Sequence, residues 1–86
     1  MNYTTYILYS KTVDKYYIGY TSDMEARLIR HNQKSKGFTG RTHDWVLKYQ
    51  EHFKTKEEAY AREREIKHWK SRKMIEKLIS GSAHPD

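Results

Sequence analysis

The chain of 86 residues contains no cysteine and only one proline. Without cysteine it can form neither a disulfide nor a thiolate metal site, which fits the reducing interior of the cell. The sequence also has no hydrophobic run long enough to span a membrane and no signal-like segment at its start. These absences predict a soluble, cytoplasmic protein that acts without a membrane.

Several common kinds of site are missing too. The four glycines do not have the spacing of a phosphate-binding loop, and no serine stands in a nucleophile-elbow pattern. The five histidines include no pair at the short spacing of zinc ligands. Nucleotide-binding, serine-hydrolase and zinc-site classes are therefore disfavoured.

The chain is rich in positive charge and in tyrosine. Seventeen Lys and Arg against eleven Asp and Glu give a net charge of +6, and eight tyrosines stand beside two Trp and two Phe. A small basic protein is biased towards nucleic acid, because each neutralised phosphate releases counterions; simple solubility is the alternative explanation. The length predicts one domain over residues 1–81, followed by a flexible tail at 82–86.

Three strands are predicted from β-branched and aromatic segments. Residues 3–10 and 16–20 form two of them, joined by a polar hairpin turn. Gly19 has no side chain to pack, which in a strand often marks the close approach of a backbone or a ligand. Residues 45–53 alternate well enough for the third strand. Its inward side chains are predicted to be Trp45, Leu47 and Tyr49.

A first helix is predicted after the second strand. Ser22 and Glu25 have the spacing of a capping box, so the helix should begin near Asp23. The helical period then places Arg27 and His31 at the edge of the apolar stripe rather than on the solvent side.

Two further helices close the chain. Thr55 and Glu58 form a second capping box, which opens a helix that runs to about Trp69. Ser71 is expected to cap a third helix, and Gly81 to stop it. The order strand, strand, helix, strand, helix, helix predicts an α+β fold, a small three-stranded antiparallel sheet flanked by helices.

A set of side chains suited to phosphodiester cleavage lies where the core should meet the surface. Tyrosine or histidine can take the proton of a water, and arginine can bind two non-bridging phosphate oxygens. A carboxylate can hold a magnesium ion that neutralises charge. The candidates are Tyr6, Tyr17, Arg27, His31 and Glu63.

Each candidate also has a plain structural explanation. The two tyrosines could be cross-strand packing partners, and the arginine and histidine could extend to solvent or cap the helix. Glu63 and Lys67 have the spacing of an ordinary ion pair on a helix surface. The residues alone leave these alternatives open.

The run Tyr6-(x10)-Tyr17-Ile18-Gly19-(x7)-Arg27-(x3)-His31 resembles the GIY-YIG endonuclease superfamily. The second half-motif is intact as Tyr17-Ile18-Gly19, and the first keeps only its tyrosine, as Thr4-Thr5-Tyr6. The later Glu58-Ala59-(x3)-Glu63 is similar to the helix that bears the family's metal-binding glutamate. The chain looks like the small single-domain bacterial members described as excision-repair-endonuclease-like.

The resemblance implies phosphodiester hydrolysis, with one divalent metal, magnesium or another such as manganese, and a link to DNA repair. By position, Tyr6 and Tyr17 would line the site, and Tyr17 or His31 would position or deprotonate the water. Arg27 would hold the scissile phosphate and Glu63 the metal.

DNA is the expected partner. The chain has no room for a separate recognition domain, so it would recognise branched, nicked or single-stranded DNA by structure, or rely on a protein partner or self-association. Basic side chains that could grip the DNA backbone are Lys34, Lys36, Arg41, Lys67 and Lys70. The expected function is a metal-dependent, structure-directed endonuclease; the alternative is a non-catalytic nucleic-acid-binding module on the same scaffold.

Overall fold

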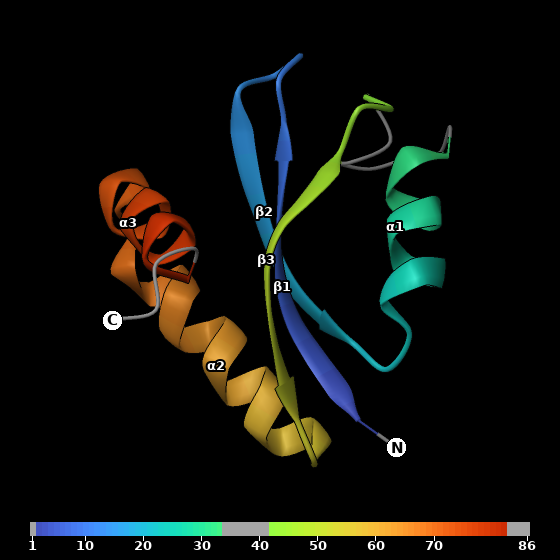
Figure 1. Ribbon diagram of the computed structural model, residues 1–86, viewed down its shortest axis with the longest axis vertical. Helices are drawn as coiled ribbons and strands as arrows, with labels where there is room; N and C mark the ends of the chain where they lie inside the picture. The colour runs from blue at the N-terminus through green and yellow to red at the C-terminus, as the bar shows by residue number, and fades with distance from the viewer. Residues whose placement is uncertain (1, 34–41, 83–86) are drawn as a thin grey trace.

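The computed structural model describes residues 2–33 and 42–82. The described elements are, in order, β1 (Tyr3–Ser10), β2 (Lys15–Thr21), α1 (Met24–Asn32), β3 (Val46–Phe53), α2 (Lys56–Trp69) and α3 (Arg72–Ser82). Together they form a three-stranded antiparallel sheet with α1 on one face and α2 and α3 on the other (Figure 1). The predicted α+β class and element order are confirmed. Within the described residues, no helix is long and apolar enough to cross a membrane.

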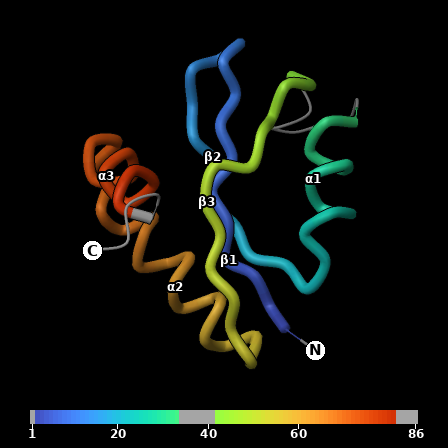
Figure 2. The backbone as a smooth tube through the Cα atoms, in the orientation of Figure 1, coloured from blue at the N-terminus to red at the C-terminus, as the bar shows by residue number. Residues whose placement is uncertain are grey.

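The sheet has the order β2-β1-β3, so β1 is central and β2 lies at an edge. The backbone tube shows the chain crossing from α1, through β3, to α2 and α3 on the far side (Figure 2). β1 is buried along most of its length because it is covered on both faces. This explains its continuous run of apolar and β-branched residues.

Alternation along β1 divides the core into two parts. Ile7 joins Ile18, Ile66 and Ile75 in the cluster under α2 and α3. Tyr6 and Leu8 face the other way and pack with Trp45, beneath α1. Since successive side chains of a strand point to opposite faces, the division follows directly from the sequence.

The prediction for β3 was wrong at Tyr49. A register shift pairs Ile7 with Tyr49 but Leu8 with Leu47, which leaves Lys48 as the extra residue of a bulge. One extra residue reverses the face of everything that follows. Leu47 therefore packs in the α1-side cluster with Trp45, as predicted, whereas Tyr49 packs in the cluster under α2 and α3.

α1 begins near Asp23 as predicted, but its cap differs from the prediction. Its N-cap is Asp23, whose carboxylate accepts a hydrogen bond from the backbone N–H of Ala26 at 3.1 Å. The Thr21 hydroxyl in turn accepts from the Asp23 N–H. A carboxylate near the positive end of the helix replaces the expected Ser22–Glu25 box.

α2 begins as predicted and α3 ends differently. Thr55 and Glu58 form the full capping box of α2, and Ser71 accepts from the N–H of Met74 at the start of α3. Lys70 has a left-handed backbone (φ 50°) and separates the two helices. Gly81 does not stop α3, because the helix continues to Ser82.

Candidate active site

Tyr6 lies at the centre of the candidate site. Its side chain is 1% exposed, and its hydroxyl forms a 3.0 Å hydrogen bond with Nε2 of His31 on α1. The ring crosses the neighbouring strand at Gly19, the residue paired with Tyr6 in the sheet. A Cβ at Gly19 would lie 2.6 Å from the Tyr6 hydroxyl oxygen, so only glycine leaves room for this ring. The close approach expected at Gly19 is therefore made by a side chain.

Aromatic rings surround this pair. The rings of Tyr17 and His31 lie 4.6 Å apart between centroids, and those of Tyr6 and Tyr17 lie 6.3 Å apart. Trp45 is within 6.4 Å of both His31 and Tyr17. Tyr17 is half-buried, whereas His31 is buried. The cluster therefore opens to the surface on the side of Tyr17.

Burial keeps both partners of the hydrogen bond uncharged. It is the main cause that raises the pKa of the Tyr6 hydroxyl, with further contributions from Tyr17 and Glu63. It also lowers the pKa of His31, and the positive charges of Arg27 and Arg30 lower it further. At neutral pH, His31 is thus an uncharged imidazole able to accept a proton.

Nδ1 of His31 is buried and has no hydrogen-bond partner among the described residues. Buried ring nitrogens are usually bonded, and the exceptions are frequent at functional sites. The 3.0 Å bond to Tyr6 is compatible with either tautomer of the imidazole. His31 thus has one ring nitrogen held by Tyr6 and one uncommitted within this part of the chain.

Arg27 brings positive charge to the same cluster. It is half-buried on α1, one helical turn before His31. In the described part of the chain, its guanidinium makes no hydrogen bond or ion pair, yet its charge influences the pKa of both Tyr6 and His31. The Arg27 guanidinium is suited to bind a phosphate, because it lies next to the buried cluster and has no partner among those residues.

Glu63 approaches the cluster from α2. Its side chain is 12% exposed and pairs with Nζ of Lys67 at 2.6 Å. Nζ of Lys67 lies 5.9 Å from the centre of the Tyr17 ring, and the charge of Glu63 contributes to the raised pKa of Tyr6. α2 and the side chain of Tyr17 lie on opposite faces of the sheet. The Lys67 ammonium therefore approaches the Tyr17 ring past the edge of β2.

Sequence reasoning missed the residue that fixes the end of α1. The side chain of Asn32 donates to the carbonyl of Trp45 at 3.0 Å and accepts from its N–H at 2.8 Å. This pair of hydrogen bonds ties α1 to the start of β3, directly beside His31. The only feature of the sequence that could have indicated this role is the presence of an amide side chain, Asn32, in the last turn of the predicted helix.

Asp44 was missed as well. Its carboxylate accepts hydrogen bonds from the hydroxyls of Ser10, Thr42 and Thr12, and from the N–H of Thr12. These bonds hold its pKa well below the usual range. They fasten the segment before Trp45 to the β1–β2 hairpin.

Of the predicted DNA-contacting residues, the structure describes two. Lys70 is exposed at the end of α2, and Lys67 is half-exposed but engaged by Glu63. Lys34, Lys36 and Arg41 lie outside the described residues.

Comparison with known proteins bears directly on this arrangement. The model of the GIY-YIG catalytic domain matches residues 2–77, which contain the whole cluster. This chain belongs to the GIY-YIG family.

Its GIY-YIG relatives include small bacterial proteins. A UPF0213 protein of Staphylococcus saprophyticus is 45% identical over 65 residues, covering 74% of this chain and 78% of the relative. One from Staphylococcus epidermidis is 38% identical over 66 residues, covering 76% and 80%. The solution NMR structure of a UPF0213 protein from Bacillus halodurans has 33% identity and a TM-score of 0.62, covering 99% of this chain and 89% of that one.

GIY-YIG membership places the chain in a nuclease family, with a nucleic acid as its class of substrate. The names of the UPF0213 relatives specify no activity. Any more specific function must therefore be inferred from the geometry and chemistry of the site.

The GIY-YIG family implies a divalent metal, which needs ligands among the side chains of the site. Within residues 2–33 and 42–82, no group of three His, Asp or Glu side chains converges to hold an ion. Magnesium often binds through one or two carboxylates, with waters and substrate phosphates completing the shell. Glu63, buried and already paired with a cation, fits that mode of binding provided that Lys67 moves.

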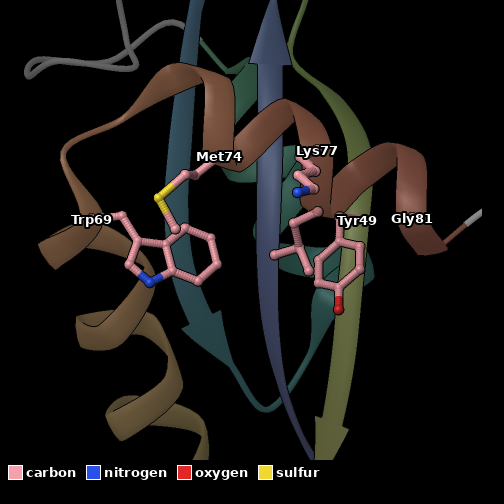
Figure 3. A pocket seen from close by; sticks show the side chains of 6 residues that line it. Tyr49, Trp69, Met74, Lys77 and Gly81 are labelled. Atoms are coloured by element: carbon pink, nitrogen blue, oxygen red, sulfur yellow. The ribbon is translucent and has the colours of Figure 1, made fainter.

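A separate apolar hollow of about 720 Å³ lies on the α3 side of the GIY-YIG domain (Figure 3). It is lined by Tyr49, Trp69, Met74, Lys77, Leu78 and Gly81. Tyr49 and Trp69 belong to the core cluster on the face away from Tyr6 and His31. The hollow is therefore no part of the candidate active site.

Proposed function

We propose that this protein is a divalent-metal-dependent endonuclease that hydrolyses phosphodiester bonds in DNA, directed by DNA structure rather than sequence. The observation that carries the proposal is the hydrogen-bonded pair of Tyr6 and His31, buried and uncharged, with the charges of Arg27 and Glu63 beside it. A purely structural role would not require the neutral imidazole of His31 to lie near the Arg27 guanidinium. Among the described residues, that guanidinium pairs with no anion.

In this proposal, the phosphate enters on the side of Tyr17 and Arg27, the half-exposed members of the cluster. Arg27 binds two non-bridging oxygens and stabilises the charge that develops as water attacks phosphorus. Tyr17, with its ring against His31, positions the water.

The pair formed by Tyr6 and His31 accepts the proton of the attacking water. If Tyr6 donates to Nε2, its oxygen takes the water proton as its own proton passes to His31; in the other tautomer, the proton goes to Nδ1, which a movement of the buried ring must first expose to the water. His31 becomes imidazolium in both cases, while the new P–O bond forms, the bond to the leaving oxygen breaks, and that oxygen is later protonated by solvent.

Glu63 is the residue that would hold the metal ion. When bound, a divalent cation supplies positive charge at the phosphate and at the leaving oxygen. Glu63 itself contributes one buried carboxylate, kept close to Tyr6 by α2.

The test is cleavage of nicked, flapped, branched and linear DNA by the pure protein, with magnesium or with a chelator. We expect cutting of at least one branched or interrupted substrate with magnesium only. Arg30→Ala, an exposed arginine on the same helix, serves as the matched control for Arg27→Ala.

The proposal fails if no substrate is cut, or if the double variant Arg27→Ala, Glu63→Ala cuts as well as the unaltered protein. Salt-dependent DNA binding without cleavage would instead support the non-catalytic binding module.

A further inference from the structure

We propose that Lys67 is the resident counterion of Glu63 and gives it up to a divalent cation when a DNA phosphate draws the ammonium away. Metal and DNA would then bind cooperatively, each favouring the other. The inference rests on the proposed function, because it concerns how the same site is loaded.

The geometry of the pair is the first argument. Nζ of Lys67 lies 2.6 Å from the Glu63 carboxylate and so occupies the position where Glu63 would bind a metal ion. The same ammonium is 5.9 Å from the centre of the Tyr17 ring. Lys67 thus contacts the carboxylate and lies near Tyr17, the half-exposed residue on whose side the proposed function places the phosphate.

Burial explains why Glu63 needs a partner at all. A carboxylate that is 12% exposed loses much of its hydration, so an unpaired charge there would be costly. Lys67 supplies the missing positive charge while no metal is bound. An ammonium and a divalent cation on one carboxylate repel each other, so binding of the metal at Glu63 favours the departure of Lys67.

Lys67 is also able to leave. Its side chain is 50% exposed, and lysine is a point charge on a flexible stem. Arg62, on the same helix, is different: its guanidinium bonds both Glu51 and Glu65 at 3.0 Å, and its side chain is 22% exposed. A phosphate bound near Arg27 offers the Lys67 ammonium a second anion, which frees Glu63 for the metal.

The experiment measures Mn²⁺ binding by electron paramagnetic resonance, with and without a short DNA duplex. A duplex with neutral methylphosphonate linkages serves as the uncharged probe. The variants are Lys67→Met, which removes the ammonium, and Lys67→Arg, which keeps a cation. Lys56→Met removes the same charge at the exposed first residue of α2 and is the matched control.

Without DNA, we expect Lys67→Met to bind Mn²⁺ about tenfold more tightly than the unaltered protein, within the usual range for coupled sites. Lys67→Arg should bind no more tightly than the unaltered protein, and Lys56→Met should be unchanged. The charged duplex should tighten Mn²⁺ binding in the unaltered protein and do so much less in Lys67→Met. The methylphosphonate duplex should have little effect.

The inference is overturned if Lys67→Met and the unaltered protein bind Mn²⁺ equally, or if the duplex tightens binding equally in both. It is also overturned if Glu63→Gln leaves Mn²⁺ binding intact. DNA cleavage, assayed in parallel, separates the two proposals. If Lys67→Met alters Mn²⁺ binding but the protein cuts no DNA, the exchange is supported and the nuclease is refuted. If the protein cuts DNA but Lys67→Met leaves Mn²⁺ binding unaltered, the nuclease is supported and the exchange is refuted.

Discussion

Replacing Gly19 by alanine should impair catalysis far more than folding. The new Cβ would lie 2.6 Å from the Tyr6 hydroxyl oxygen and 2.8 Å from Cζ, whereas ordinary contacts begin near 3.4 Å. The hydroxyl must therefore move by about 0.8 Å. Tyr6 is 1% exposed and cannot slip into solvent, so the shift strains or breaks its 3.0 Å bond to His31.

The expected magnitudes follow from that displacement. A misplacement of about 1 Å in a catalytic pair typically costs about 100-fold in rate, so we expect cleavage by Gly19→Ala to fall by about that factor. Overpacking costs about 1–3 kcal/mol, and the smaller backbone entropy of alanine in the unfolded chain returns about 0.5–1 kcal/mol. A net loss of about 1 kcal/mol lowers the Tm of a domain of this size by about 4–8 °C.

The assay compares DNA cleavage, DNA binding and thermal unfolding for Gly19→Ala and Gly81→Ala. Gly81 lies in α3, and a Cβ added there would meet no atom within 4 Å. Alanine at this position should therefore raise stability by about 0.5–1 kcal/mol and leave cleavage unchanged. DNA binding should be similar in both variants. Wild-type cleavage and an unchanged Tm in Gly19→Ala would refute the reasoning.

Three further predictions concern charges. Arg27→Ala should lower initial cleavage rates by about 100- to 1000-fold at fixed ionic strength, and Arg30→Ala by less than about tenfold; equal losses would contradict the role of Arg27. Because the pKa of His31 is lowered in the fold, the unfolded chain binds the extra proton more readily, so the free energy of unfolding should fall as pH decreases below 6.5. Urea titrations should show a flatter decline for His31→Gln, and identical curves would count against the buried neutral imidazole. The pKa of Asp44 is lowered by its hydrogen bonds from Ser10 and Thr42, so its stabilisation is present above 3.8 and lost at lower pH. Asp44→Asn should therefore lower Tm at pH 7, with a difference that narrows in acid.

The helices were predictable because their signals are local. Thr55 and Glu58 cap α2 within one turn of chain, and Ser71 caps α3 in the same way. The start of α1 near Asp23 was predicted correctly, but its capping residue was not, because the carboxylate of Asp23 caps the helix in place of Ser22.

The sheet was predictable only as far as its alternation is regular. The faces of β1 follow from period two, which sends Tyr6 and Ile7 to separate clusters. The bulge at Lys48 carries no local signal, because it depends on how β3 pairs with β1. Tyr49 was consequently assigned to the wrong face.

The sequence named candidate residues for the site but not their geometry. Spacing and residue type singled out all five side chains, and their motif indicated the family. No pattern in the chain showed that the Tyr6 ring crosses Gly19 or that the Asn32 amide holds Trp45 beside His31.

The sequence by itself determined the elements and the two faces of β1, since these depend on neighbours within a few positions, and its motif spacing named the candidate residues of the site. The tertiary structure alone decided that His31 is buried and uncharged, because its desolvation comes from β1, β2 and Trp45, which are distant along the chain. It also decided that the Glu63–Lys67 pair, an ordinary surface pattern by spacing, is half-buried against Tyr17 at the edge of β2. Desolvation and contact across a sheet edge depend on the packed fold, and no local pattern encodes them.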